Sequence, residues 1–428
     1  MKNKRILFLL PLSLFVFIFL FLRLYHLEDS LNFSSDQGQT LLDTYNLFQS
    51  RKITLIVQNG ASWRIEGRYL FFGSLPYYIF MPLLILFKWD PLVISYFFIF
   101  LHLIVGLIIF KILYDRNKWD LAILFMILWT FTPLLVDYSR FVWFTNFLIP
   151  LGGIMLSLLL ICQKSKKPKI TTFLIGLISG VGFAIHFSFI LAFLAGIVWF
   201  LYLQKTDKRR ILLYILGFIF GISPLLIFEL RHNFYNLRTV FFLINEGRKE
   251  DVHPIYNITF YYLFSLLPFF LYLFSILWLK VKKKNAFLFY SLTAVFIINS
   301  SIKILAIPSH GFTMPPGWNY LGIQKASSII ISQNKKSYNL VDLLTGDTRA
   351  ASLRYLLTIN GKPPLSVNDY PNSQYLFLYT REPIDKILKG SLWELDVLKP
   401  LKVTDKWYLQ SGIYLYLLEK DTPQTPTL

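Results

Sequence analysis

The sequence predicts an all-α polytopic membrane domain of about nine transmembrane helices, followed by a small C-terminal α/β domain outside the cytoplasm. Three observations lead to this fold class. Long apolar runs recur through residues 1–305, short basic clusters separate them, and the composition resembles that of a soluble protein after residue 306. Of the 428 residues, 55% are hydrophobic and only 16% are charged, against about 25% charged in soluble proteins. This composition excludes an ordinary cytosolic enzyme, a disordered chain and, with one cysteine, a disulfide scaffold.

The apolar runs are the candidate spans, because a transmembrane helix needs about 20 residues. They cover residues 6–22, 69–87, 91–110, 121–136, 145–162, 170–203, 211–228, 257–279 and 286–305. As one helix, the run 170–203 would be about 51 Å long at a rise of ~1.5 Å per residue. We therefore expect it to form two shorter spans, with His186 at the turn.

Basic residues indicate which ends of the spans face the cytoplasm. Five clusters hold 18 Lys and Arg residues against three acids, around residues 2–5, 111–118, 164–169, 205–210 and 280–284. The rest of residues 1–305 holds 12 basic and 11 acidic residues. The positive-inside rule places the clusters in the cytoplasm. The net charge of +19 therefore reflects membrane orientation, and no nucleic-acid partner is expected.

This orientation conflicts with a membrane crossing by residues 69–87, since every later cluster would then lie outside. We expect this segment to be an interfacial or re-entrant helix on the outer side. The topology then has nine spans, a cytoplasmic N-terminus and an outer C-terminus. We therefore expect a multi-pass protein of the cell (plasma) membrane. The first span lacks a small-residue cleavage site, so we expect an anchor and not a removed signal peptide.

The chain divides into a membrane domain at 1–305, a linker at 306–317 rich in proline and glycine, and an extracytoplasmic domain at 318–428. The last domain alternates in the manner of an α/β protein. Its pattern predicts helices at 322–332 and 348–359, and strands at 338–344, 374–379 and 412–418.

Ionisable side chains on the outer side are candidate functional residues, because charge near a membrane is costly. Asp36 and Asp137 are candidate catalytic residues, since either carboxylate can accept the proton of an attacking hydroxyl. Arg68, Arg140 and Arg231 can hold the phosphate of a lipid through charge-assisted hydrogen bonds.

Aromatic and histidine side chains add to this set. Tyr77 and Tyr78 can line a groove for a sugar or a lipid. His186 can bind phosphate or carry a proton. Glu229 and Arg231 stand together at the end of a span, where they can contact the same substrate.

Each candidate also has a structural interpretation without chemistry. Asp36 can cap a helix over residues 37–48. Interfacial ion pairs, turn residues and belt aromatics are common in membrane proteins. Asp137 with Arg140, and Glu229 with Arg231, can be such ion pairs. His186 can be a turn residue, and Tyr77 and Tyr78 can be belt aromatics.

No metal, nucleotide or hydrolase motif occurs in the chain. The histidines are scattered, so a tight metal site is not indicated. A divalent ion held weakly by two carboxylates such as Asp36 and Asp137 stays open as a cofactor.

The order of several short motifs carries a family resemblance. An outer loop containing Ser34-Ser35-Asp36-Gln37-Gly38-Gln39 is followed by Gly73-Ser74-Leu75-Pro76-Tyr77-Tyr78, then by Pro82, Trp89-Asp90-Pro91, Pro133-x-x-x-Asp137-Tyr138-Ser139-Arg140-Phe141 and Phe228-Glu229-Leu230-Arg231-His232. Over about residues 1–305, this order resembles the GT-C class of integral-membrane glycosyltransferases. The similarity is greatest to prokaryotic family 39, protein-mannosyltransferase-like and aminoarabinose-transferase-like enzymes.

The resemblance implies a shared core of seven spans with two juxtamembrane helices in the first outer loop. It also implies a polyprenyl-phosphate sugar donor and a glycan, lipid or protein acceptor on the outer face. The family's first-loop Asp-Glu motif maps its Asp onto Asp36, whereas Gln37 replaces the Glu. This departure weakens any role that needs two adjacent carboxylates. The acidic position of the second loop maps onto Asp137.

The resulting hypothesis is an inverting transfer of a monosaccharide from a polyprenyl phosphate, undecaprenyl or dolichyl, to an acceptor hydroxyl. Asp36 acts as the base, and Arg140 and Arg231 stabilise the departing phosphate. Two alternatives stay open at this point. One is a transporter or flippase of lipid-linked sugars, and the other is a non-catalytic membrane scaffold.

Overall fold

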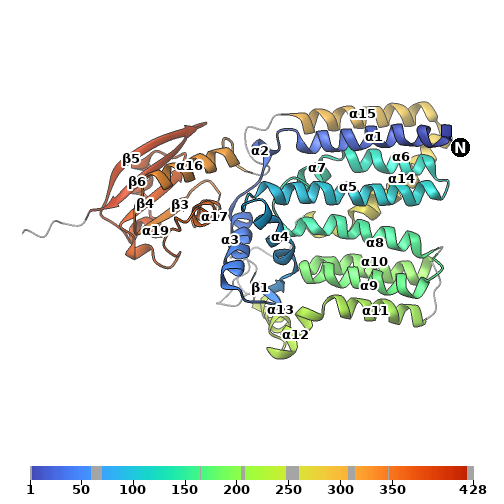
Figure 1. Cartoon of the computed structure of the whole chain (residues 1–428), viewed down its shortest axis with the longest axis horizontal. Coiled ribbons are helices and arrows are strands. Elements are labelled where there is room, and N and C mark those ends of the chain that lie inside the picture. Colours follow the sequence, from blue (N-terminus) through green and yellow to red (C-terminus); the bar gives the residue numbers. More distant parts are fainter. Residues whose placement is uncertain are drawn as a thin grey trace, which may run out of the picture.

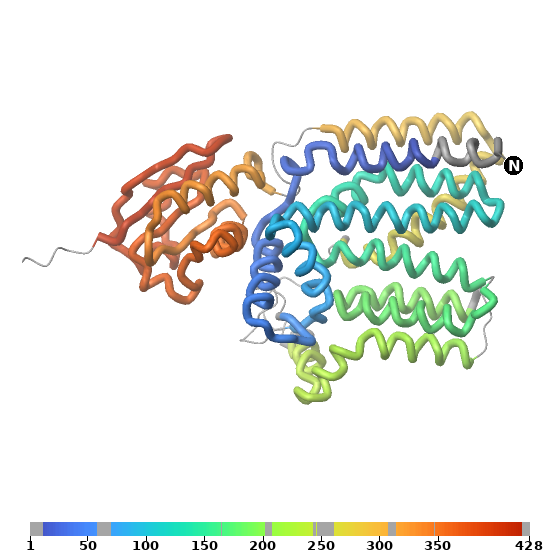
Figure 2. Tube along the Cα trace, in the orientation of Figure 1, coloured from blue at the N-terminus to red at the C-terminus, as the bar shows by residue number. Residues whose placement is uncertain are grey.

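The computed structural model describes residues 2–58, 70–163, 165–203, 208–246, 260–306, 314–345 and 347–421. It consists of a bundle of apolar helices with a sheet-containing region at one end (Figure 1). The start of α1 (Lys2–Leu24) lies at the opposite end of the bundle. The Cα trace shows the same arrangement, with the segment that follows α1 packed between the bundle and the sheet region (Figure 2).

Five described helical segments are long and apolar enough to cross a bilayer. They are α5 (Leu92–Asp115), Phe144–Cys162, which ends with α8 (Leu148–Cys162), α9 (Pro168–Ile185), Tyr261–Lys284, which ends with α14 (Leu267–Lys284), and α15 (Ala286–Leu305). The pair α11 (Lys208–Gly221) and α12 (Ser223–Arg231), bent by 66°, makes a sixth if it forms one span. The other predicted spans coincide with shorter apolar helices, including α6 (Trp119–Phe131), so the count of nine stays a prediction.

The predicted turn at His186 within residues 170–203 is confirmed, whereas the two spans on either side of it stay a prediction. Helix α9 ends at Ile185, and His186 has an extended backbone with φ −157° and ψ 126°. The chain then forms η3 (Phe187–Phe189), α10 (Ile190–Val198) and η4 (Trp199–Leu203). This break brings the ring of His186 to 5.8 Å from that of Phe72, centroid to centroid, on β2 (Phe71–Gly73).

Helices α9 and α11 approach each other unusually closely. A Cβ atom built on Gly176 of α9 would lie 2.0 Å from the carbonyl oxygen of Tyr214 on α11. A Cβ atom on Gly217 of α11 would lie 2.2 Å from the carbonyl oxygen of Phe173. Only glycine permits this backbone contact, which fixes the two helices where they border the groove described below.

Short elements connect the bundle to the sheet region. They are α2 (Leu27–Ser30), α3 (Ser35–Ser50), the antiparallel strands β1 (Ile56–Gln58) and β2 (Phe71–Gly73), and α4 (Leu75–Leu86). Figure 1 shows α3 and α4 at the end of the bundle. The 12 residues of α4 extend about 18 Å, less than the ~30 Å of a bilayer core. Helix α6, a predicted span, is nearly as short with 13 residues, so the interfacial position of residues 69–87 stays a prediction.

Further short elements interrupt or flank the later helices. Helix α7 (Pro133–Tyr138) continues α6 after a break at Thr132, and η2 (Phe144–Phe147) precedes α8. Helix α13 (Tyr235–Glu246) follows α12, and η5 (Phe260–Leu266) precedes α14.

The C-terminal region contains a four-stranded sheet of order β3-β4-β6-β5, in which only β3 and β4 are parallel. Its elements are α16 (Tyr320–Ser332), β3 (Tyr338–Asp342), α17 (Ala351–Ile359), η6 (Tyr370–Asn372), β4 (Tyr375–Thr380), α18 (Ile384–Lys389), α19 (Trp393–Asp396), β5 (Leu401–Gln410) and β6 (Ile413–Lys420). The predicted helices and strands are present. Strand β5 was not predicted, because it is an edge strand with many exposed polar residues and little apolar alternation.

The sheet region and the bundle share one hydrophobic core. The ring of Phe33, just before α3, packs edge-on against Tyr320 and Tyr355, with both pairs of ring centroids 5.7 Å apart. The hydroxyl of Tyr355 donates a hydrogen bond to the carbonyl oxygen of Trp89 at 2.5 Å. These contacts hold the C-terminal region against α3.

Candidate active site

Asp36 lies in the first turn of α3, facing the loop that follows β3. Nearby, the hydroxyl of Ser35 donates a hydrogen bond to that of Thr345 across 3.3 Å. The charged neighbours of Asp36 are Asp347 and Arg349, which form an ion pair of 2.5 Å with each other. Burial and the negative charge of Asp347 raise the pKa of Asp36, while the positive charge of Arg349 acts against this rise. A carboxylate in this setting can act as a general base closer to neutral pH than an ordinary aspartate.

A second carboxylate, Asp43, lies two turns further along the same helix. It accepts a hydrogen bond of 2.8 Å from the side chain of Gln39, and no cation forms an ion pair with it in the described chain. Burial raises the pKa of Asp43 to about 6. Burial, and in second place the negative charge of Asp43, raise the pKa of the Tyr77 phenol on α4, so the two side chains are neighbours. Sequence reasoning missed Asp43, although its seven-residue spacing from Asp36 places both on one helix face.

The second predicted acidic residue, Asp137, belongs to a different charged cluster. Its neighbours are Arg140 and Arg23, the latter from the last turn of α1. Arg140 donates to the carbonyl oxygen of Tyr25 at 2.5 Å, while Arg23 donates to the carbonyl oxygens of Trp129 and Thr130 at 3.1 and 3.3 Å. Sequence reasoning also missed Arg23, whose signal was an arginine directly after an apolar run.

This cluster has more positive than negative charge. Two guanidinium groups accompany one carboxylate, and in the described chain neither arginine lies within 4.0 Å of Asp137 as an ion pair. The Nε–H groups of Arg23 and Arg140 are buried and lack a hydrogen-bond partner there. Burial lowers the pKa of Arg140 to about 10, so it stays charged at neutral pH. Buried cations without enough counter-charge favour an anionic ligand.

A layer of aromatic rings connects this cluster to His186. Tyr138, Trp143, Tyr261, His186 and Phe72 follow one another with successive centroid distances of 6.4, 5.0, 5.9 and 5.8 Å. Burial lowers the pKa of His186 to about 4, so its ring is neutral at pH 7.

The hydrogen bonds of His186 also define its tautomer. The backbone N–H of Ser188 donates to Nδ1 at 3.3 Å, which assigns the ring proton to Nε2. A neutral imidazole cannot attract phosphate through charge, but its Nε2–H can donate a hydrogen bond to an anion.

An apolar groove of about 390 Å³ lies between the segment 53–55, the end of β2 and the start of α4 on one side and helices α9, α11 and α12 on the other. One wall is formed by Ile53, Thr54, Leu55, Gly73, Ser74, Leu75 and Tyr78, and the other by Leu177, Val181, Ala184, Phe220, Gly221, Ser223 and Pro224. The groove adjoins a small inner pocket that shares Gly73 and is lined by Tyr77, Phe72, Phe144 and Ile185. The groove therefore leads from the side of the bundle toward the aromatic layer.

In the structure, two of the predicted site residues, Tyr78 and Glu229, form hydrogen bonds with the backbone. The hydroxyl of Tyr78 accepts from the backbone N–H of Thr54 at 2.8 Å and donates to its carbonyl oxygen at 3.0 Å, which fixes the groove wall. The carboxylate of Glu229 accepts from the backbone N–H groups of Asn236 and Leu237 at 3.1 and 3.2 Å. It therefore caps the N-terminus of α13.

The predicted residues thus fall into separate groups. Asp137, Arg140 and His186 adjoin one aromatic layer, and Tyr77 lies in the neighbouring pocket. Arg231 is exposed at the end of α12, and Arg68 lies outside the described residues. Among the described residues, no group of three or more His, Cys, Asp or Glu side chains is arranged to hold a metal ion.

No protein-family model and no curated protein sequence matches this chain. Among solved structures, it matches the crystal structure of ArnT from Cupriavidus metallidurans bound to undecaprenyl phosphate, with a TM-score of 0.53 and 10% sequence identity. The match covers 95% of this chain and 97% of ArnT. The chain has the fold of ArnT. The resemblance to GT-C, aminoarabinose-transferase-like proteins is therefore confirmed at the level of the fold.

The ArnT-like fold includes the C-terminal region, because the match extends over nearly the whole chain. The contact between this region and α3 is tightest at Gly38, where a Cβ atom would lie 2.4 Å from the backbone nitrogen of Ser352. The contact lies one turn or less from Asp36, so it sets the position of that carboxylate relative to Arg349.

Replacing Gly38 with alanine should loosen this contact. The added methyl group meets backbone atoms of Ala351 and Ser352, and overpacking of this kind costs about 1–3 kcal/mol. Thermal unfolding and limited proteolysis of the C-terminal region measure the effect. Gly390→Ala is the control, because its Cβ atom would lie 3.3 Å from the carbonyl oxygen of Ile387, its nearest neighbour outside the adjoining residues. Equal stability of both variants would contradict the tight contact at Gly38.

Proposed function

We propose that this protein is a membrane glycosyltransferase that transfers a monosaccharide from a polyprenyl-phosphate donor to an acceptor hydroxyl. The observation that carries the proposal is the order of three neighbouring sites at one end of the bundle. An apolar groove leads to an aromatic layer, and the layer leads to a buried cluster with excess positive charge. A polyprenyl chain, a sugar and a phosphate have matching chemistry in the same order. The ArnT-like fold supports the proposal, since ArnT binds undecaprenyl phosphate.

In the proposed reaction, the acceptor hydroxyl attacks the anomeric carbon and the bond from that carbon to the phosphate oxygen breaks. Asp36 takes the hydroxyl proton, and the bonding electron pair leaves with the lipid phosphate. Arg140 and Arg23 stabilise the phosphate as its charge develops. A single in-line displacement inverts the anomeric centre.

The other residues bind and orient the substrates in this proposal. His186 donates a hydrogen bond from Nε2 to the phosphate, and Asp43 with Tyr77 binds hydroxyl groups of the sugar. Arg231, exposed at the end of α12, attracts the donor phosphate as it arrives. The acceptor, which is a glycan, lipid or protein, approaches Asp36 from the side of Arg349 and the C-terminal region.

The proposed location is the cell (plasma) membrane, with the C-terminal region outside the cytoplasm. The connections after α5 and α14, both rich in lysine and arginine, lie at the end of the bundle where α1 begins (Figure 1). The positive-inside rule supports a cytoplasmic position for this end. The groove and both charged clusters then belong to the outer leaflet.

The groove can be tested by filling it. Val181→Trp should raise the KM for a long-chain polyprenyl-phosphate sugar about 10-fold, because displacing two buried methylene groups costs ~0.8 kcal/mol for each. A soluble short-chain donor should be used with nearly unchanged kinetics. Purified protein, radiolabelled sugar donors of two chain lengths and product analysis provide the measurement.

Leu174→Trp on the same helix is the matched control, because Leu174 is exposed and does not line the groove. An equal loss with both donors in Val181→Trp would contradict a lipid-binding groove. Movement of the donor across a vesicle membrane without a new glycosidic bond would overturn the transferase proposal in favour of a flippase.

A further inference from the structure

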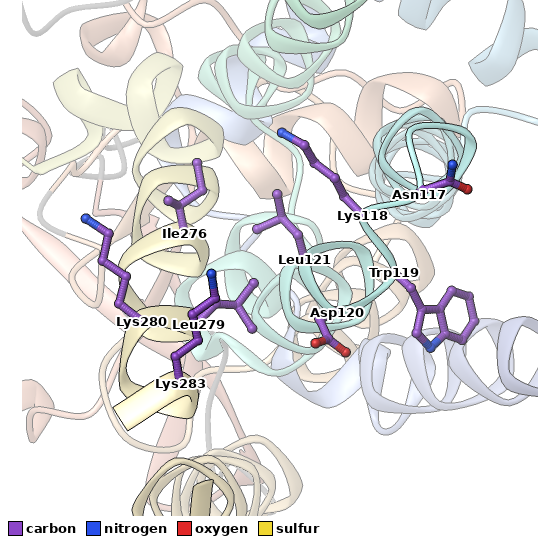
Figure 3. A pocket seen from close by; sticks show the side chains of 9 residues that line it. All are labelled: Asn117, Lys118, Trp119, Asp120, Leu121, Ile276, Leu279, Lys280 and Lys283. Atoms are coloured by element: carbon purple, nitrogen blue, oxygen red, sulfur yellow. The ribbon is translucent and has the colours of Figure 1, made fainter. Parts of the chain in front are cut away.

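A larger cleft, of about 570 Å³, lies at the other end of the bundle. It separates the start of α6 from the last two turns of α14 (Figure 3). Its lining comprises Asn117, Lys118, Trp119, Asp120, Leu121, Ile276, Leu279, Lys280 and Lys283. None of these residues belongs to the groove, the aromatic layer or the charged clusters of the candidate active site.

The cleft carries positive charge that the described chain does not neutralise. Lys118, Lys280 and Lys283 line it and form no ion pair with a described residue. The carboxylate of Asp120 already pairs with Lys282 at 2.8 Å. The only carboxylate of the lining is therefore already paired, while three lysines of the lining have no acidic partner among the described residues.

The rest of the lining is apolar or amphipathic. Leu121, Ile276 and Leu279 form the aliphatic part of the lining. The indole ring of Trp119 packs edge-on against Phe110 and Tyr114, with centroid distances of 5.9 and 5.4 Å. Lysine side chains pack their methylene groups along apolar surface and extend their ammonium groups toward water. A ligand with an anionic head group and a hydrocarbon chain would therefore complement this surface.

The backbone adds to this preference for an anion. Helix α6 has 13 residues and begins inside the cleft, at Trp119. No side chain caps its first N–H groups, and such groups favour a nearby anion such as phosphate.

We infer that this cleft binds the phosphate head group of an anionic phospholipid from the cytoplasmic leaflet. The three lysines contact the head group, and the acyl chains follow the apolar wall between α6 and α14. Basic pockets between transmembrane helices on the cytoplasmic side recognise lipids in this way. The inference rests on the orientation of the bundle and not on the proposed glycosyltransferase activity.

Native mass spectrometry of the full-length protein in a neutral detergent tests this inference. Phosphatidylglycerol should bind about 10- to 100-fold more tightly than phosphatidylcholine, given the contribution of each lysine near an anionic lipid. The triple variant Lys118→Gln, Lys280→Gln, Lys283→Gln should lose this preference. Melting temperatures measured in parallel show whether the variant is folded, and Lys280→Gln alone should weaken binding by a smaller factor.

The matched control is Lys166→Gln, Lys167→Gln, Lys169→Gln, which removes the same charge from the same end of the bundle outside the cleft. It should bind phosphatidylglycerol within about twofold of the unmodified chain, because surface charge away from the cleft contributes little at moderate salt. Equal losses in both triple variants would overturn a specific site. Displacement of the lipid by millimolar inorganic phosphate or glycerol phosphate would also overturn it, in favour of a site for free phosphate.

Discussion

Replacing Asp36 with asparagine should lower kcat by about 10²- to 10⁴-fold, the range that a positioned general base contributes. The asparagine side chain keeps the size, and the N-cap of α3 is Ser34 and not Asp36 as the capping interpretation required, so the helix should not unfold. It cannot take the proton of the acceptor hydroxyl. Turnover of a synthetic polyprenyl-phosphate sugar by the purified variant provides the measurement, and binding of the donor should change little.

Asp43→Asn is the matched comparison, because it removes a carboxylate from the same helix face. We expect a higher KM for the donor and a kcat within about tenfold of the unmodified enzyme, since Asp43 is proposed to bind the sugar. The reverse result, with a large loss of kcat only in Asp43→Asn and an acid limb near the Asp43 pKa of about 6, would transfer the role of base to Asp43.

Asp347→Asn gives an independent readout for Asp36. The negative charge of Asp347 contributes to the raised pKa of Asp36, so its removal should lower that pKa. The acid limb of kcat/KM should then move to lower pH, because Asp36 stays ionised further into the acidic range. An unchanged acid limb would show that another group controls it.

The main architecture could be predicted from the sequence, because the length of each apolar run and the position of each basic cluster are local properties of the chain. The break at His186 followed from the length of one apolar run. The interfacial position of residues 69–87 followed from the placement of the basic clusters and stays a prediction. Strand β5 could not be predicted in the same way. As an edge strand it is held by pairing with β6, and its own side chains carry little hydrophobic pattern.

The candidate site depended more on tertiary contacts, which the sequence does not reveal. Glu229 looks like a partner for Arg231 along the chain, but the bend of α12 against α13 gives its carboxylate two backbone N–H groups instead. Arg23 was hidden at the end of an apolar run, and only the packing of α1 against α6 and α7 brings it to Asp137. Asp36 and Asp137 were both identified, but their membership of different clusters required the structure.

The second large effect is expected for Arg140→Gln, which should lower kcat about 10²- to 10³-fold, as the loss of one donor to a developing anion typically does. Arg140 is buried, charged and has an Nε–H without a partner in the described chain. Glutamine removes the charge, while Arg23 alone stays beside Asp137 and balances its charge without any excess for phosphate. The KM for the donor should rise as well, because the phosphate is bound before it departs. Steady-state kinetics with a polyprenyl-phosphate sugar separate the two effects.

Stability must be measured with Arg140→Gln, because Arg140 also donates to the carbonyl oxygen of Tyr25. Arg140→Lys keeps the positive charge and should recover part of the activity, whereas a purely structural role would make both variants equally unstable and equally inactive. Arg231→Gln is the second comparison. Its exposed side chain lies outside the buried cluster, so its loss should raise the donor KM a few-fold and leave kcat nearly unchanged. A folded Arg140→Gln enzyme with normal turnover would show that the donor phosphate does not bind at this cluster, because the excess buried charge would then have no catalytic consequence.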